Sequence, residues 1–204
     1  MIRVLVVNIS GMGDGEYRRL YDLASAQRRE RADRYLRRED AMRCVTAEAL
    51  LRYVTGGNVS VLQTTEGKPY LPDAPDFHFN LTHSGDFVAI AYGSSPVGID
   101  IEQIRPDGFR PEIARRFFTP AEQEFSATPE KFFQIWSMKE SYLKCLGTGL
   151  AYPMQSVDVL AKSLAPQFYI GGLPGHTLAV FSVDADKKVE EITVSQLISS
   201  FGIN

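Results

Sequence analysis

The chain has 204 residues, of which 44% are hydrophobic, and a formal net charge of −3. This length allows one large domain or two small ones with a buried core, and the near-neutral charge gives no general indication of nucleic-acid binding. Two cysteines and three histidines do not suggest a zinc cluster. The apolar N-terminal run is too short for a transmembrane helix and has no signal-peptide pattern, so we expect a reduced, cytoplasmic protein with no membrane partner.

The first half is predicted to contain a buried strand, a helical region and three short strands. Thr55-Gly56-Gly57-Asn58 is predicted to end the last helix, because glycine readily takes the left-handed conformation that follows a helix. The turn signal Ser84-Gly85 predicts that the last two strands form a hairpin. The predicted strands are 2–9, 59–63, 77–82 and 86–92, and helical segments lie across 16–56.

The second half begins after Ser94-Ser95-Pro96, which breaks the chain. Thr119-Pro120-Ala121-Glu122 is typical of a helix start, with Thr as the cap, Pro in the first turn and Glu three residues on. Gly147 and Gly149 are predicted to end a long helix. The predicted helices are 110–117, 120–126 and 130–145, and the predicted strands are 97–102, 156–161, 167–171, 177–183 and 188–194.

Each half therefore offers helices and a small sheet. We predict an α+β fold of two similar lobes, a pseudo-dimer, in which each lobe has a small antiparallel sheet with packed helices. The N-terminal lobe is predicted to span 1–96, and the C-terminal lobe, which carries the clustered carboxylates, is predicted to span 97–204.

Two pairs of charged residues are the clearest chemical signal. Asp100 and Glu102 are two residues apart in a predicted strand and share a face, while Glu140 and Lys144 are one helical turn apart. Taken alone, Asp100 and Glu102 also fit the solvent-exposed face of an edge strand. Taken alone, Glu140 and Lys144 also fit an ordinary ion pair on a helix. Together, three carboxylates and a lysine predict a binding site for Mg²⁺ and a phosphate-bearing substrate.

Two further segments offer groups that can hold phosphate. Thr82, His83, Ser84 and the Gly85 amide lie at a turn, although they also fit a capped hairpin with a surface histidine. Seven arginines lie between residues 28 and 43, together with four acidic residues. This run fits either a solvated helix face with ion pairs or a phosphate-binding wall.

Four segments, in their order and spacing, resemble the 4′-phosphopantetheinyl transferases. The length and two-lobed layout are similar to the Sfp type, not to the half-length trimeric type, and the resemblance runs from about residue 20 to 155. The four segments are Gly67-Lys68-Pro69, Phe79-Asn80-Leu81-Thr82-His83-Ser84, Gly98-Ile99-Asp100-Ile101-Glu102 and Trp136-Ser137-Met138-Lys139-Glu140-Ser141.

The resemblance implies a role for each matching residue. Asp100, Glu102 and Glu140 match the carboxylates that bind Mg²⁺, and Lys144 matches a lysine near the pyrophosphate of coenzyme A. The remaining matches lie around coenzyme A: Thr82, His83, Ser84 and Gly85 at its phosphates, Arg28, Arg31 and Arg43 at its 3′-phosphate and adenosine end, and Lys68 and Pro69 near its adenine.

The reaction implied by this resemblance moves 4′-phosphopantetheine from coenzyme A, the substrate, to a serine of an apo acyl or peptidyl carrier protein. Adenosine 3′,5′-bisphosphate is released. Glu140, Lys144 and His83 are the catalytic candidates, and a monomer with no nucleic-acid partner is expected. Two alternatives stay open: a non-catalytic module that binds coenzyme A or carrier proteins, and a Mg²⁺-dependent nuclease, which should have a wider basic surface.

Overall fold

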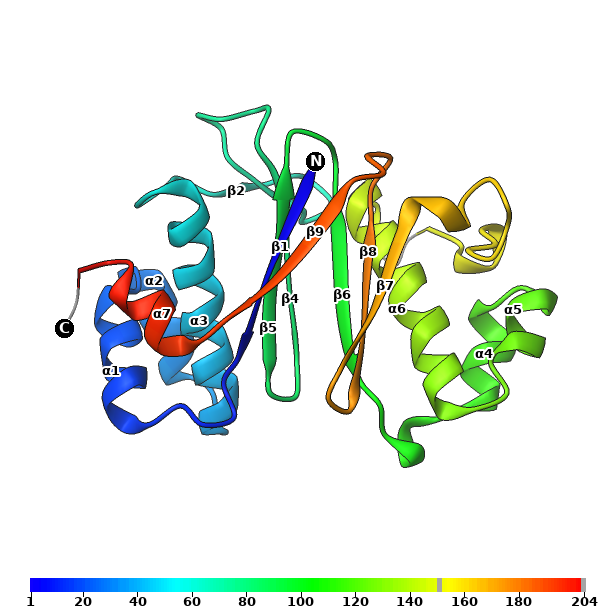
Figure 1. Cartoon of the computed structure of the whole chain (residues 1–204), viewed down its shortest axis with the longest axis horizontal. Helices are drawn as coiled ribbons and strands as arrows, with labels where there is room; N and C mark the ends of the chain where they lie inside the picture. The colour runs from blue at the N-terminus through cyan, green and yellow to red at the C-terminus, as the bar shows by residue number, and fades with distance from the viewer. Residues whose placement is uncertain (150–151, 203–204) are drawn as a thin grey trace.

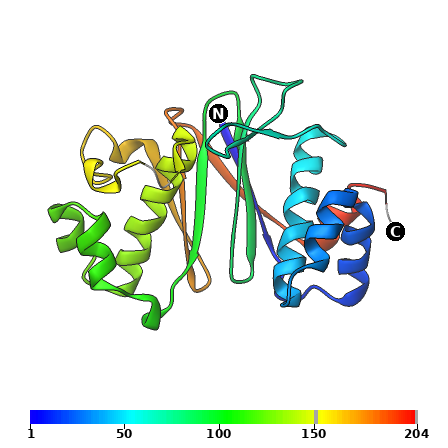
Figure 2. The same cartoon turned by 180° about the vertical axis from the view of Figure 1, so that it is seen from behind.

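The computed structural model describes residues 1–149 and 152–202. It confirms an α+β fold of two lobes, each built from one main sheet and its own helices (Figure 1). The two sheets lie at the centre and the helices lie on the two outer sides, as the view from behind also shows (Figure 2). Among the helices that the structure describes, none is long and apolar enough to cross a membrane.

The first lobe is built on a four-stranded sheet with the strand order β4-β5-β1-β9. Strand β1 is antiparallel to β5 and parallel to β9, so the sheet is mixed at one edge. A separate two-stranded hairpin, β2-β3, precedes β4. The strands are β1 (Ile2–Asn8), β2 (Leu62–Gln63), β3 (Pro69–Tyr70), β4 (His78–Ser84), β5 (Phe87–Gly93) and β9 (Lys187–Ile192); the helices are α1 (Asp14–Leu23), α2 (Ala26–Asp33), α3 (Arg38–Thr55) and α7 (Val194–Ser199).

The second lobe is built on a three-stranded antiparallel sheet with the order β6-β8-β7. The long helix α6 packs along β6 and β8. The strands are β6 (Gly98–Gln103), β7 (Phe168–Leu173) and β8 (His176–Phe181), and the helices are α4 (Pro111–Phe117), α5 (Pro120–Phe125) and α6 (Pro129–Leu146).

Alternating apolar side chains explain how the two sheets pack. Val4 and Val6 of β1 share one buried cluster with Ile99 and Ile101 of β6, so this cluster fills the space between the sheets. Each sheet also packs against its own helices through one further buried cluster. The expected period of two in β6 is confirmed. Ile99 and Ile101 face the core between the sheets, and Asp100 and Glu102 point to the other face of the strand.

Helix boundaries follow the expected capping signals. Thr119 forms the predicted capping box with Glu122 at the start of α5. Helices α3 and α6 end at Gly56 and Gly147, which both have φ of 76°, the left-handed conformation that favours glycine. The C-terminal end of α6 fixes the position of Lys144.

The prediction of a strand at 156–161 is wrong. A 3₁₀ turn at Met154–Ser156 and further turns occupy this segment. Its backbone groups bond to buried side chains in place of a neighbouring strand: Lys139 donates to the carbonyls of Met154 and Val157, at 2.8 and 2.7 Å, and Glu122 accepts from Val159 N–H at 2.8 Å. A backbone satisfied in this way does not need a sheet.

The end of the described chain returns to the first lobe. The predicted strand 188–194 forms as β9, which pairs with β1, and α7 packs against α1 and α3. The second sheet therefore contains β6, β7 and β8 only, although β9 and α7 follow them in sequence.

Candidate active site at the seam between the lobes

A pocket of about 380 Å³ lies where β4 of the first lobe meets β6 and α6 of the second. The pocket brings together Thr82, His83, all three predicted metal carboxylates and Lys144. Its lining residues are Leu81, Thr82 and His83 from β4, Asp100, Ile101 and Glu102 from β6, and Trp136, Glu140 and Lys144 from α6.

Side chains of β4 bond directly to the backbone of β6 along one wall of this pocket. Both strands lie at the edges of their own sheets, so each has a side free for such contacts. Every second residue of β4 accepts from a β6 amide: Asn80 Oδ1 from Ile99 N at 2.9 Å, Thr82 Oγ1 from Ile101 N at 3.3 Å, and Ser84 Oγ from Gln103 N at 3.0 Å. We call this set of three contacts the seam ladder.

Asp100 is the most buried carboxylate of the pocket, with 4% of its surface exposed. Lys144 Nζ donates to Asp100 Oδ1 at 2.6 Å and to the Ile99 carbonyl at 3.3 Å. Burial raises the pKa of Asp100 above its ordinary value, and the charge of Lys144 only partly opposes this. The other oxygen, Oδ2, is buried and has no hydrogen-bond partner of normal geometry among residues 1–149 and 152–202, although the hydroxyl of Ser137, also without such a partner, lies close enough to Asp100 to oppose the rise of its pKa.

The other two carboxylates are also destabilised in their charged forms. Burial, followed by the charge of Asp100, raises the pKa of Glu102 to about 7. The same two causes raise the pKa of Glu140. Three crowded carboxylates beside one lysine therefore favour the binding of an additional cation.

The donor set fits Mg²⁺ in part. No group of three or more acidic, histidine or cysteine side chains in the described residues is close enough to enclose a metal. Mg²⁺ usually binds one or two carboxylates together with waters and substrate phosphates, so it does not need a closed cage of protein ligands. The unpartnered Oδ2 of Asp100, together with the raised pKa of Glu102, is the observation that supports such a site.

His83 lines the pocket on the side of the first lobe, and the cation of Arg43 lies near it without lining the pocket. Arg43 donates to the carbonyl of Gly85 at 2.6 Å and to Asp40 at 2.5 Å. Desolvation by surrounding atoms lowers the pKa of His83, and the cations of Arg43 and Lys144 lower it further, although the side chain is open to solvent on one side. The turn residue Gly85 has φ of +52°, and a Cβ there would lie 2.3 Å from the ring of His176.

None of the three predicted arginines lines this pocket. Arg28 is paired with Glu48 at 3.2 Å, and its side chain is 27% exposed. Arg31 is exposed, and its Nε donates to the hydroxyl of Tyr35 at 3.3 Å. A role of either residue at the 3′-phosphate stays a prediction.

Lys68 lies across the two lobes. Its Nζ donates to the carbonyl of Cys145, in the last turn of α6, at 2.5 Å, and its stem packs over Gly147. Burial lowers the pKa of Lys68. Pro69 follows it at the start of β3. Their predicted place near adenine is not tested by these contacts.

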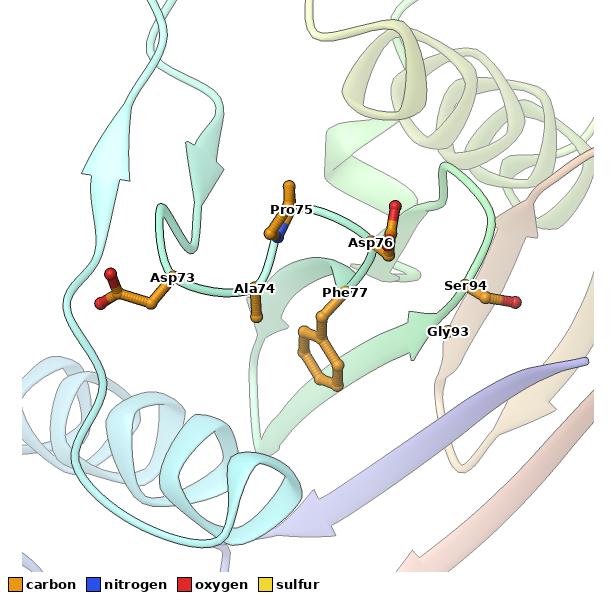
Figure 3. Close-up of a pocket in the computed structure, with 7 residues that line it drawn as sticks. All are labelled: Asp73, Ala74, Pro75, Asp76, Phe77, Gly93 and Ser94. Carbon is orange, nitrogen blue, oxygen red and sulfur yellow. The ribbon is translucent and has the colours of Figure 1, made fainter.

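A second hollow, of about 510 Å³, lies between residues 73–77 and the end of β5 (Figure 3). Its charged lining residues are Asp73 and Asp76, and Phe77 is its aromatic group. Among the described residues no lysine, arginine or histidine lines it, so it has no cationic group for a phosphate, unlike the smaller pocket at the seam.

Sequence reasoning missed two groups near the site. The family motif contains Asn80 without giving it a role. The two-residue steps from Asn80 to Thr82 and from Thr82 to Ser84 are nevertheless a signal that the three residues share one polar face of the strand. Lys139, next to Glu140, is 2% exposed and forms an ion pair with Glu122 at 2.8 Å. No sequence pattern identifies that partner, because the two residues lie on different helices.

Comparison with known proteins identifies the family of the chain. Residues 96–188 match the model of the 4′-phosphopantetheinyl transferase superfamily, and residues 13–95 match that of the 4′-phosphopantetheinyl transferase N-terminal region. A 4′-phosphopantetheinyl transferase of Bacillus subtilis is 37% identical over 161 residues, which cover 72% of this chain and 71% of that protein. The chain belongs to the 4′-phosphopantetheinyl transferase superfamily.

Other relatives support the same membership. The transferase is 38% identical over 157 residues to 4′-phosphopantetheinyl transferase Sfp of Bacillus subtilis strain 168, which covers 71% of this chain and 69% of the relative. It is 34% identical over 172 residues to 4′-phosphopantetheinyl transferase psf-1 of Bacillus pumilus, covering 76% and 73%. The predicted resemblance to the Sfp type is therefore confirmed.

Proposed function

We propose that this transferase moves the 4′-phosphopantetheine group of coenzyme A to a serine hydroxyl of an apo acyl or peptidyl carrier protein. The serine oxygen forms a bond to the phosphorus that carries the pantetheine arm. The bond between this phosphorus and the bridging oxygen of the pyrophosphate breaks, which releases adenosine 3′,5′-bisphosphate. The observation that carries the proposal is the pocket in which three carboxylates and Lys144 converge, in a member of this family.

Asp100, Glu102 and Glu140 are the proposed ligands of Mg²⁺. When bound, the ion neutralises negative charge on the pyrophosphate and on the developing leaving group. The raised pKa values of Glu102 and Glu140 support this assignment, because a nearby cation would stabilise both charged forms.

Lys144 and His83 are proposed to face the phosphates from opposite sides of the pocket. Lys144, on α6, is bound to Asp100 and is 31% exposed, so its ammonium group is available to an entering phosphate. His83, on β4, supplies a ring N–H. These donors act where negative charge grows on the leaving group, which is the general basis of electrostatic stabilisation in phosphoryl transfer.

A general base must take the proton of the serine hydroxyl. We propose Glu140, which lies on α6 and lines the pocket together with Asp100 and Glu102 of β6. Burial and the charge of Asp100 raise the pKa of Glu140, which makes it a stronger base than an exposed glutamate while no cation is bound to it. A carboxylate cannot be both a tight metal ligand and a strong base, so one of the two proposed roles of Glu140 must dominate.

The basic residues of the first lobe are proposed to hold the nucleotide end of coenzyme A. Arg43 is bound to the turn at Gly85, which follows the pocket residue His83 by two positions. Arg28 and Arg31 would read the 3′-phosphate, and Lys68 and Pro69 would lie near the adenine. We further propose that the enzyme acts as a monomer, since both walls of the pocket come from one chain, and that it works in the cytoplasm.

The test uses purified transferase, coenzyme A, Mg²⁺ and a panel of apo carrier proteins. Mass spectrometry of each carrier should show the added phosphopantetheine on its serine, and chromatography should show an equal amount of adenosine 3′,5′-bisphosphate. EDTA should stop the reaction and Mg²⁺ should restore it. A chain that binds coenzyme A but modifies no carrier in the panel would support a non-catalytic binding module instead.

A further inference from the structure

The seam ladder replaces ordinary strand pairing between the two sheets. Ile99 and Ile101 of β6 are fully buried, so their amides need partners other than water. Asn80 and Thr82 of β4, both 6% exposed, supply the two oxygen acceptors. Leaving a buried amide without a partner is costly, so the ladder favours one position of β6 beside β4.

The same side chains reach the carboxylates. Thr82 Oγ1 lies 3.5 Å from Asp100 Oδ1, and Ser84 Oγ lies 3.4 Å from Glu102 Oε2. Each hydroxyl thus accepts from a β6 amide and lies at the outer range of a hydrogen bond to a β6 carboxylate. A hydroxyl has a single proton to donate, so donation to the carboxylate competes with donation to a phosphate oxygen.

We propose that Asn80, Thr82 and Ser84 are positioning residues that fix Asp100 and Glu102 at the pocket. The proposal rests on the proposed function, because the two carboxylates are the assigned metal ligands. It adds a positioning role to the one that the family resemblance implies for Thr82 and Ser84. Asn80 is not among the residues that line the pocket, so it acts through β6.

Thr82→Val is the sharpest test, because valine keeps the shape and loses the hydroxyl. Thr82→Ser keeps the hydroxyl and should restore wild-type behaviour. Thr46→Val is the matched control: Thr46 is fully buried in α3, and its hydroxyl has no hydrogen-bond partner in the described part of the chain. Three quantities are measured for each variant: kcat, KM for coenzyme A, and the affinity for Tb³⁺.

Tb³⁺ reports on the carboxylates without catalysis. Trp136, the only tryptophan of the chain, lines the same pocket and can sensitise the luminescence of a lanthanide bound there. We expect Thr82→Val to lower kcat and Tb³⁺ affinity by about 10- to 100-fold, the usual effect of losing a group that orients a metal ligand. KM for coenzyme A should stay within about twofold, and Thr46→Val should match the wild type.

Asn80→Leu, at a position outside the pocket, should give the same selective loss of kcat and Tb³⁺ affinity. It also serves as the second variant if Thr82→Val does not fold. A rise in KM for coenzyme A with unchanged kcat and Tb³⁺ affinity would overturn the proposal and make Thr82 a ligand. If the wild type modifies no carrier, the proposed function fails, but the Tb³⁺ comparison of Thr82→Val with Thr82→Ser still decides the positioning role.

Discussion

Replacing Glu102 by glutamine tests the electrostatics of the pocket independently of activity. Burial and the charge of Asp100 raise the pKa of Glu102 from 4.5 to about 7 in the folded protein. In the unfolded chain the carboxyl ionises near 4.5, so between these two values the folded state keeps a proton that the unfolded state has lost. The free energy of unfolding of the wild type therefore falls as the pH rises through this window.

The magnitude follows from the same difference. Each tenfold change in an ionisation constant corresponds to about 1.4 kcal/mol, so the rise from 4.5 to about 7 corresponds to about 3 kcal/mol above pH 7. Glutamine has nearly the same shape and is neutral at every pH. Without metal, we expect Glu102→Gln to exceed the wild type in free energy of unfolding by about 3 kcal/mol at pH 8, and by less than about 1 kcal/mol at pH 5.

Urea unfolding in EDTA, followed by circular dichroism at pH 5, 6, 7 and 8, measures this difference. Glu124→Gln is the control, because Glu124 is an exposed carboxylate whose loss should change little at any pH. Mg²⁺ should stabilise the wild type at pH 8 and have less effect on Glu102→Gln. Equal stability of Glu102→Gln and the wild type at pH 8 would refute the reasoning, since it would mean that the charged carboxylate is well solvated.

Three further predictions concern residues around the pocket. Glu140→Gln should lower transfer by about 100-fold or more while calorimetry shows coenzyme A binding within about tenfold; turnover above about a tenth of wild type would remove Glu140 from both proposed roles. Lys139→Met should lower the free energy of unfolding in urea by about 3–5 kcal/mol, because it leaves Glu122 charged and fully buried; adding Glu122→Gln should recover part of this loss, and no recovery would argue against the ion pair as the cause. The double variant Arg28→Ala, Arg31→Ala should bind coenzyme A nearly as weakly as dephospho-coenzyme A in calorimetry; a full preference for coenzyme A would leave these arginines as a solvated helix face.

Local periodicity was sufficient to find most of the chemistry. The i, i+2 spacing of Asp100 and Glu102 and the i, i+4 spacing of Glu140 and Lys144 each put two groups on one face, and all four line one pocket. The glycine ends of α3 and α6 were predicted for the same reason, because they depend on residues within one turn.

Contacts between distant segments could not be predicted in this way. Nothing local in Asn80 or Thr82 indicates that the neighbour of β4 is the backbone of β6, and nothing in Arg28 indicates Glu48. Residues 156–161 have the composition of a strand, but their backbone partners are Lys139 and Glu122, which are set by the packing of α5 and α6. Side-chain partners of buried backbone groups depend on the tertiary structure, so a local sequence pattern does not predict them.

The parallel pairing of β9 with β1 has a consequence for the order in which the protein can form. Strand β1 lies at the start of the chain, and its neighbour on one side is synthesised only after the whole second lobe. Until then β1 exposes an unpaired edge, which can pair with other chains. During synthesis the sheet of the first lobe therefore stays incomplete until the second lobe has been made. A fragment that stops after β5 would keep this edge of β1 unpaired. Such a long sequence separation between paired strands also slows folding, because a large loop must close before the contact forms.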